Sequence, residues 1–373
     1  MGALIDVVGH FGTTFSYATV GSMVARALRE HGLLGSVWNV DAAWHPSFGD
    51  LRSITAEMMP ATHVLVFAGP FHYMDAYPLQ YGRARSAIFM SPNTDRLAPE
   101  HAETCGKYGL AVVPSAWCES AVRASVDPET QVAHLPLGTS VAFSGSRRDR
   151  VFQLGMRLSR RRKNPPCRVL HFSTDQSWPG RKGTEELLAA WALLSCSGRL
   201  RGAHLTVHVP PALNADAEYR CRDLEVDESV TVAITEEHGS DDDPLSLMLD
   251  GADLVVAPSR CEGFGMMLLA SLVAGVPLLS TYNTGHADFL ARSPGWMGIP
   301  TAQTGPLHGE DGLCPVVEPE VLAQGLAVAM RPGARRALLQ SGLSFDAGDS
   351  WGTWPEATRL WVARLTEWVE ETA

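Results

Sequence analysis

Residues 259 to 281 read SRCEGFGMMLLASLVAGVPLLST, in which a carboxylate and two glycines directly precede a long apolar run. Glu262 stands first, and Gly263 and Gly265 flank Phe264. Because the first backbone N–H groups of a helix have no partner within it, this segment could bind an anion at a helix start. The two glycines would let the backbone approach a bulky anion closely. The alternative is a tight turn between a strand and a helix, without a ligand.

A pair of cations, Arg181 and Lys182, precedes the helical pattern GTEELLAAWALL. Two cations are unfavourable at a helix start, which favours negative charge. Their position is explained if an anion lies between them and the helix after Gly265. Arginine supplies a bidentate fork and lysine a compact charge, which suits a diphosphate. Glu262 would then accept hydrogen bonds from sugar hydroxyls, and the alternative for the cations is a solvated basic pair.

Short β-branched runs alternate with amphipathic stretches along most of the chain, which predicts α/β units with parallel sheets. We expect two doubly wound, Rossmann-like domains, over residues 1–150 and 165–350, with a ligand cleft at the carboxyl ends of their strands. The last stretch, residues 352–373, carries three tryptophans and a leucine along one helical face. It is expected to pack back across the first domain, and a helix that caps only the second domain is the alternative.

Composition excludes several classes of protein. The chain has 373 residues, 45% of them hydrophobic, and a net charge of −11, which disfavours a general nucleic-acid binder. No apolar run approaches the roughly 20 residues of a membrane span, and the start of the chain has no basic leader, so we expect a cytoplasmic protein. Seven scattered cysteines without zinc spacing predict reduced thiols and no structural metal. One segment, Arg147 to Lys163, is strongly basic; a solvated helix face is the simpler interpretation.

The segments PSRCEGFGMMLLASLVAGVPLLSTYNTGHADFL and RKGTEELLAAW resemble the donor-binding half of retaining glycosyltransferases of family 4, which have the GT-B fold. The resemblance covers most of the chain and is strongest from 168 to 290. It implies that the domains bind a nucleotide-diphosphate sugar, such as a UDP-sugar, in the cleft between them, without a further cofactor or a metal. It also implies roles for particular residues: Glu262 for sugar hydroxyls, Lys182 for the diphosphate, and Gly263, Phe264 and Gly265 under the phosphates and sugar. The glycine-rich loop from Gly9, including Gly12 and Thr13, would meet the donor from the first domain.

Three positions depart from the family pattern. Ala270 stands where the family has a second glutamate that holds the ribose, which puts ribose recognition in doubt. Ser173 and Thr174 replace a glycine-arginine pair, so Arg181 is expected to supply that charge from another direction, and Thr174 remains a donor-binding candidate. Thr139 and its neighbour stand where an aspartate is common, which indicates a change in linker capping.

Four polar residues follow strands of the first domain and are candidates for the acceptor side: His10, His72, Asn93 and Asp95. Structural roles explain the two histidines more simply than proton transfer does. The acidic run at 239–249 resembles a metal-binding signature, and a helix N-cap with dipole partners explains it more simply.

The predicted function is a metal-independent, retaining glycosyltransferase that moves a hexosyl or pentosyl group to an acceptor hydroxyl. A small molecule or a saccharide is the default acceptor. The basic segment from Arg147 to Lys163 leaves open a modified, hydroxymethylated pyrimidine in viral DNA. Two alternatives belong to other classes: a GT-B sugar-nucleotide epimerase, and a sugar-nucleotide binder without turnover.

Overall fold

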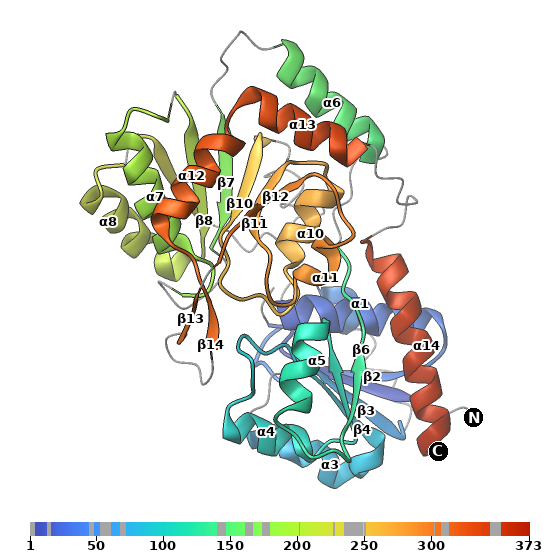
Figure 1. Ribbon diagram of the computed structural model, residues 1–373. Coiled ribbons are helices and arrows are strands. Elements are labelled where there is room, and N and C mark those ends of the chain that lie inside the picture. Colours follow the sequence, from blue (N-terminus) through green and yellow to red (C-terminus); the bar gives the residue numbers. More distant parts are fainter. Residues whose placement is uncertain are drawn as a thin grey trace.

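Two parallel sheets flanked by helices make up the protein, as the computed structural model shows (Figure 1). The structure describes residues 4–12, 16–44, 48–52, 61–67, 72–139, 147–160, 167–173, 180–200, 202–226, 228–234, 249, 251–301, 303–306, 313–343 and 352–373.

The first sheet has six parallel strands in the order β2-β1-β3-β4-β5-β6. Its strands are β1 (Ile5–Gly9), β2 (Leu34–Asn39), β3 (His63–Phe67), β4 (Ser86–Phe89), β5 (Leu110–Val113) and β6 (Gln131–His134). The helices of this half are α1 (Ser16–Glu30), α2 (Gly49–Arg52), η3 (His72–Asp75), α3 (Ala76–Tyr81), η4 (Arg83–Arg85), α4 (Pro99–Gly106) and α5 (Ala116–Arg123). The order reverses direction beside β1, which is the doubly wound arrangement expected from alternating strands and helices.

The second sheet repeats this plan with the order β12-β11-β10-β7-β8-β9, again all parallel. Its strands are β7 (Arg168–Phe172), β8 (His204–Val209), β9 (Val230–Ile234), β10 (Leu254–Ala257), β11 (Leu278–Thr281) and β12 (Trp296–Ile299). The antiparallel pair β13 (Gln303–Pro306) and β14 (Leu313–Val316) stands apart from it. The helices are α6 (Arg147–Arg160), α7 (Thr184–Cys196), η5 (Pro211–Leu213), α8 (Asn214–Asp223), α10 (Met266–Val273), α11 (Ala287–Leu290), α12 (Pro319–Ala329), α13 (Pro332–Leu343) and α14 (Trp354–Thr372).

Helix α14 leaves the second half and runs back along the first sheet (Figure 1). Trp361 and Trp368 are buried there, and their indole N–H groups donate to the carbonyls of Pro136 and Ala84 at 3.0 and 3.1 Å. The tryptophan face of the last helix therefore has the partner surface that its sequence requires. Two doubly wound parallel sheets and a returning helix confirm the predicted fold class.

Two chain segments run side by side where the halves join. The N–H of Thr139 donates to the carbonyl of Gly352 at 2.9 Å, and Thr139 forms an isolated parallel bridge with Thr353. A Cβ atom at Gly138 would lie 2.4 Å from the backbone nitrogen of Trp354, so only glycine fits there. The boundaries predicted at 150 and 165 fall close to residues outside the described ranges and stay a prediction.

Helix α6 carries the first part of the basic segment and packs against α13. Val151 and Leu154 on α6 are buried, whereas the side chain of Phe152 is exposed. The buried pair explains why this segment is helical despite its charge, because it gives the helix one apolar side. Residues 161 to 166 lie outside the described ranges.

All seven cysteines are free thiols; six are buried and Cys196 is exposed. Within the described part of the chain, no helix has the length and apolar character needed to cross a bilayer.

Candidate active site

Glu262, Lys182 and Arg181 meet at one edge of the second sheet. Strands β7 and β10 are neighbouring parallel strands, so the loops after them leave the sheet at the same edge. The loop after β7 carries the two cations, and the loop after β10 carries the carboxylate. Residues 80 positions apart are thereby brought into direct contact. The convergence predicted from the two sequence segments is present in the structure.

The carboxylate of Glu262 is buried, with 3% of the residue exposed, and is fully hydrogen bonded. Lys182 Nζ donates to both carboxylate oxygens at 2.7 and 2.9 Å, and an Arg181 Nη donates to one of them at 3.2 Å. The Ser259 hydroxyl donates to the other oxygen at 2.8 Å. A carboxylate has about four acceptor positions, and these four bonds occupy them. The anion that explains the two cations in this structure is therefore Glu262 itself.

The charges of the two cations keep Glu262 ionised. Burial by itself raises the pKa of this carboxyl, but the nearby charges of Lys182 and Arg181 more than offset burial and lower the pKa to about 2. Two cations and one carboxylate leave the group with one net positive charge at neutral pH. This net positive charge favours the binding of a second anion at the site.

Two glycines allow the loops to come this close. Gly183, next to Lys182, has φ +69°, and a Cβ atom there would lie 2.2 Å from the carbonyl oxygen of Pro258. Gly265 has φ +89° and is the N-cap of α10, where it offers no side chain to the first N–H groups of the helix. Both positions need the left-handed conformation that glycine adopts without strain. The start of α10 therefore has no side-chain cap, which leaves its first backbone N–H groups to be satisfied in another way.

Two buried histidines support these loops and were not singled out in the sequence. His171 Nδ1 lies 2.9 Å from the Val256 carbonyl oxygen and so carries the ring proton, while Nε2 lies 2.9 Å from Thr184 Oγ1. His286 Nε2 lies 3.0 Å from the Thr281 carbonyl oxygen. Burial lowers the pKa of each histidine to about 4, so both are neutral at pH 7. The only sequence signal for His171 is its place inside an apolar strand.

We expect the free energy of unfolding to fall as the pH drops from about 6.5 to about 4. In this window the unfolded chain protonates these histidines, whose usual pKa is 6.5, while the folded protein keeps them neutral. Each group contributes up to about 1.4 kcal/mol per pH unit. Urea unfolding at a series of pH values would show this slope. A stability that stays flat from pH 6.5 to 4, or rises, would contradict the burial of two neutral rings.

The acceptor-side candidates of the first half lie in three places. His10 Nδ1 lies 2.8 Å from Asp41, whose other carboxylate oxygen accepts from the N–H of Gly12 at 2.6 Å. Asp95 accepts from the N–H of Leu313, at the start of β14, at 3.1 Å. Asn93 lies in the same connection after β4, and His72 opens η3 with its side chain outside the described set. Thr13, Thr174 and most of the acidic run at 239–249 are also outside the described residues.

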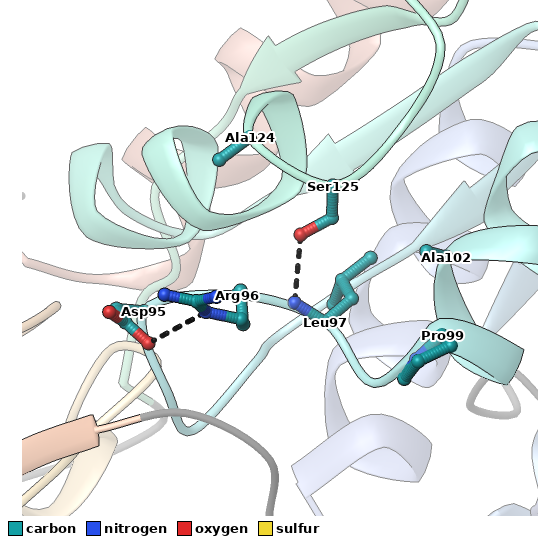
Figure 2. Close-up of a pocket in the computed structure, with 7 residues that line it drawn as sticks. All are labelled: Asp95, Arg96, Leu97, Pro99, Ala102, Ala124 and Ser125. Carbon is teal, nitrogen blue, oxygen red and sulfur yellow. Dashed lines mark hydrogen bonds and ion pairs between the residues drawn. The ribbon is translucent and has the colours of Figure 1, made fainter.

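A cavity of about 380 Å³ lies beside Asp95, within the first half (Figure 2). Figure 2 shows Asp95 and Arg96 together at one side and Ser125 above Leu97. The Ser125 hydroxyl accepts from the N–H of Leu97 at 2.9 Å. The cavity is lined by Asp95, Arg96, Leu97, Pro99, Ala102, Ala124 and Ser125. Of the described residues that the sequence singles out, Asp95 alone lines this cavity.

Comparisons with known proteins agree with the architecture of two parallel sheets. Residues 123–308 match the family described as "Family 4 Glycosyltransferase in conflict systems". No curated protein sequence matches the chain. Among solved structures, WaaG, a glycosyltransferase involved in lipopolysaccharide biosynthesis, is 16% identical and has a TM-score of 0.62 over 96% of this chain and 99% of its own.

Two further solved structures share the same fold along their full length. Sucrose-phosphate synthase from Thermosynechococcus elongatus is 13% identical, with a TM-score of 0.69 over 100% of both chains. Anabaena HepE, in complex with UDP and glucose, is 13% identical, with a TM-score of 0.64 over 98% of this chain and 100% of its own. The chain is a family 4-like glycosyltransferase of the GT-B fold.

Proposed function

We propose that this enzyme takes its sugar from a nucleotide-diphosphate sugar, needs no metal, and retains the anomeric configuration of the sugar. The observation that carries the proposal is the meeting of Lys182, Arg181 and Glu262 within 2.7 to 3.2 Å beside the start of α10. Anabaena HepE, which has the same fold, has been solved with UDP-glucose. UDP-sugars are therefore the first donors to test.

In this proposal, donor binding exchanges one anion for another. The diphosphate draws Lys182 and Arg181 toward itself, because it carries more charge than the carboxylate they hold in the free enzyme. The lone pairs that the cations release on Glu262 then accept hydrogen bonds from the sugar hydroxyls. The sugar is oriented only once the diphosphate has bound, which couples recognition of the two parts of the donor.

The chemical step is a same-face substitution at the anomeric carbon. The bond from this carbon to the phosphate oxygen breaks, the acceptor oxygen forms its bond on the same face, and the leaving phosphate takes the acceptor proton. Charge grows on the diphosphate during this step. Lys182, Arg181 and the N–H groups at the start of α10 stabilise that charge more in the transition state than before it.

One experiment separates this proposal from its rivals. Calorimetry with a panel of nucleotide sugars identifies the donor, and product analysis with and without saccharide or small-molecule acceptors follows. A transferase releases nucleoside diphosphate and a glycoside with unchanged anomeric configuration when an acceptor is present. Consumption of donor without an acceptor, to give an epimer, would identify an epimerase. Binding without any turnover would identify a sugar-nucleotide binder, and an inverted product would overturn the retaining mechanism.

DNA is a second candidate acceptor, because eight of the residues from 146 to 166 are arginine or lysine in a protein with a net charge of −11. Helix α6 spans part of this segment and packs against α13. We expect transfer to hydroxymethylated DNA, if DNA is the acceptor, to fall steeply as salt rises, because neutralised phosphates release counterions. Assays over a salt series, with the Arg147→Glu/Arg148→Glu variant beside the unchanged protein, test this. If the rate of transfer to DNA falls with salt no more steeply than the rate of transfer to a small acceptor, the small acceptor is the substrate.

A further inference from the structure

The start of α5, in the first half, holds the carbonyl oxygen of Gly263 in the second. The Ser115 hydroxyl donates to this oxygen at 2.6 Å and the Cys118 thiol donates to it at 3.2 Å. Ser115 and Cys118 are fully buried, and burial raises the pKa of Cys118 to about 12, so its thiol keeps the proton that it donates. A Cβ atom at Gly263 would lie 1.9 Å from Ser91 Oγ, so a side chain there would force the Ser91 hydroxyl to move.

A second contact joins the same two elements. Asp288 in α11 accepts from the N–H of Ala116, the first residue of α5, at 2.8 Å, and the same oxygen lies 3.5 Å from His134 Nε2. A carboxylate at a helix start is favoured both by the unpaired N–H groups and by the helix dipole. The Asp288 carboxylate and the Gly263 carbonyl thus both bind the start of α5, through Ala116 and Ser115.

These contacts reach Glu262 through the backbone. The N–H of Gly285 donates to the Glu262 carbonyl at 2.8 Å, and the N–H of Glu262 donates to Thr284 Oγ1 at 3.0 Å. The carbonyls of Glu262 and Gly263 are both held, the first by its own half and the second by the opposite half. Because peptide groups are planar, fixing two successive carbonyls also fixes the N–H groups of Gly263 and Phe264. The position of the Glu262 loop therefore depends on contact between the two halves of the enzyme.

We propose that Ser115 and Asp288 are positioning residues for transfer: they dock the Glu262 loop on the start of α5 and so set the donor site only when the two halves are together. We call Ser115, Cys118, Asp288 and the Gly263 carbonyl the interdomain clasp. This inference rests on the proposed function. It adds that the first half of the enzyme influences the donor site through the backbone carbonyl of Gly263. An enzyme built in this way forms its complete donor site only in the closed form, which limits hydrolysis of the donor by water.

The test compares variants that break the clasp with matched variants that leave it intact. Ser115→Ala removes the hydroxyl, and Asp288→Ala removes the carboxylate while the Ser115 cap of α5 stays in place. Asp288→Asn keeps an acceptor oxygen for Ala116 and serves as the conservative variant. Two controls lie on the exposed side of α5: Ser120→Ala, whose hydroxyl donates to the Ala116 carbonyl of its own helix, and Glu119→Gln, whose partner is Arg123.

Two readouts are measured on the full chain. Hydrogen exchange of the amides from Glu262 to Gly265 is expected to speed up about tenfold in Ser115→Ala and Asp288→Ala, because each loses a hydrogen bond between the halves. kcat/KM for donor is expected to fall about tenfold or more, mainly through kcat, with Asp288→Asn close to the unchanged enzyme. Ser120→Ala and Glu119→Gln are expected to match the unchanged protein in both readouts.

The proposed clasp would be overturned if hydrogen exchange and kcat/KM in Ser115→Ala and Asp288→Ala were the same as in the two controls. Faster exchange with unchanged kcat/KM would overturn its positioning role. Failure of the proposed function has a different signature: the unchanged protein would turn over no nucleotide sugar. Hydrogen exchange would then still decide whether the contact between Gly263 and α5 exists, because that readout needs no substrate.

Discussion

Lys182→Ala is expected to lower kcat/KM for sugar transfer by about 100- to 1000-fold, the usual cost of removing one group that stabilises transition-state charge. Lys182 is the residue that contacts both oxygens of Glu262 in the free enzyme and, in the proposed complex, the departing diphosphate. Initial rates at several donor concentrations measure the effect. Because the lost interaction strengthens as charge develops, the larger part of the loss should appear in kcat.

Lys182→Ala also leaves the buried Glu262 carboxylate with one cation fewer. We therefore expect the free energy of unfolding to fall, by at most about 3 to 5 kcal/mol. The double variant Lys182→Ala/Glu262→Gln removes both charges and should regain stability without regaining transfer. Lys107→Ala is the matched control, because Lys107 forms its ion pairs at the surface of the first half, with Asp75 and Glu103. A Lys182→Ala enzyme that is folded and turns over at the normal rate would contradict the assignment.

Glu262→Gln is expected to change two measured quantities in opposite directions. Transfer should fall about 100-fold or more, because the amide orients the sugar hydroxyls less well than a carboxylate with two acceptor oxygens. Affinity for the free nucleoside diphosphate should rise about tenfold, because Lys182 and Arg181 no longer share their charge with a carboxylate. Calorimetry with UDP and initial-rate assays give the two values on the same preparation.

A rise in UDP affinity together with a fall in transfer distinguishes a residue of the donor site from one that only stabilises the fold. A variant that is merely destabilised would lose affinity and activity together. Glu185→Gln is the matched control, since Glu185 lies in the first turn of α7 and pairs with Arg220 at 2.8 Å, away from Glu262. Weaker binding of UDP by Glu262→Gln would contradict the exchange of anions that the proposal requires.

Much of this architecture was predictable because parallel sheets follow simple patterns. Apolar runs such as HVLVF and LVVA are strands buried on both faces, and the loops after them must leave at one sheet edge. Two cations after one strand and a carboxylate after another could therefore be expected to meet. The tryptophans of the last helix were equally informative, since so much apolar surface needs a partner.

The electrostatic state of the site was not predictable in the same way. The sequence indicates that an anion balances Lys182 and Arg181 but does not say which anion, because an internal carboxylate and a ligand leave the same local pattern. The contact between Gly263 and Ser115 joins residues 148 positions apart and depends on how the two halves dock. Strands β12, β13 and β14 were not predictable from such runs, because WMGI, QTGP and LCPV each contain a glycine or a proline, which are unfavourable inside strands.

A crystal structure with a nucleotide-diphosphate sugar or UDP would show whether Lys182, Arg181 and the start of α10 bind one diphosphate. We expect phosphate oxygens within about 3 Å of Lys182 Nζ and of backbone N–H groups at the start of α10, with Glu262 turned to the sugar. A nucleotide bound elsewhere, with the pair between Lys182 and Glu262 undisturbed at 2.7 Å, would contradict it.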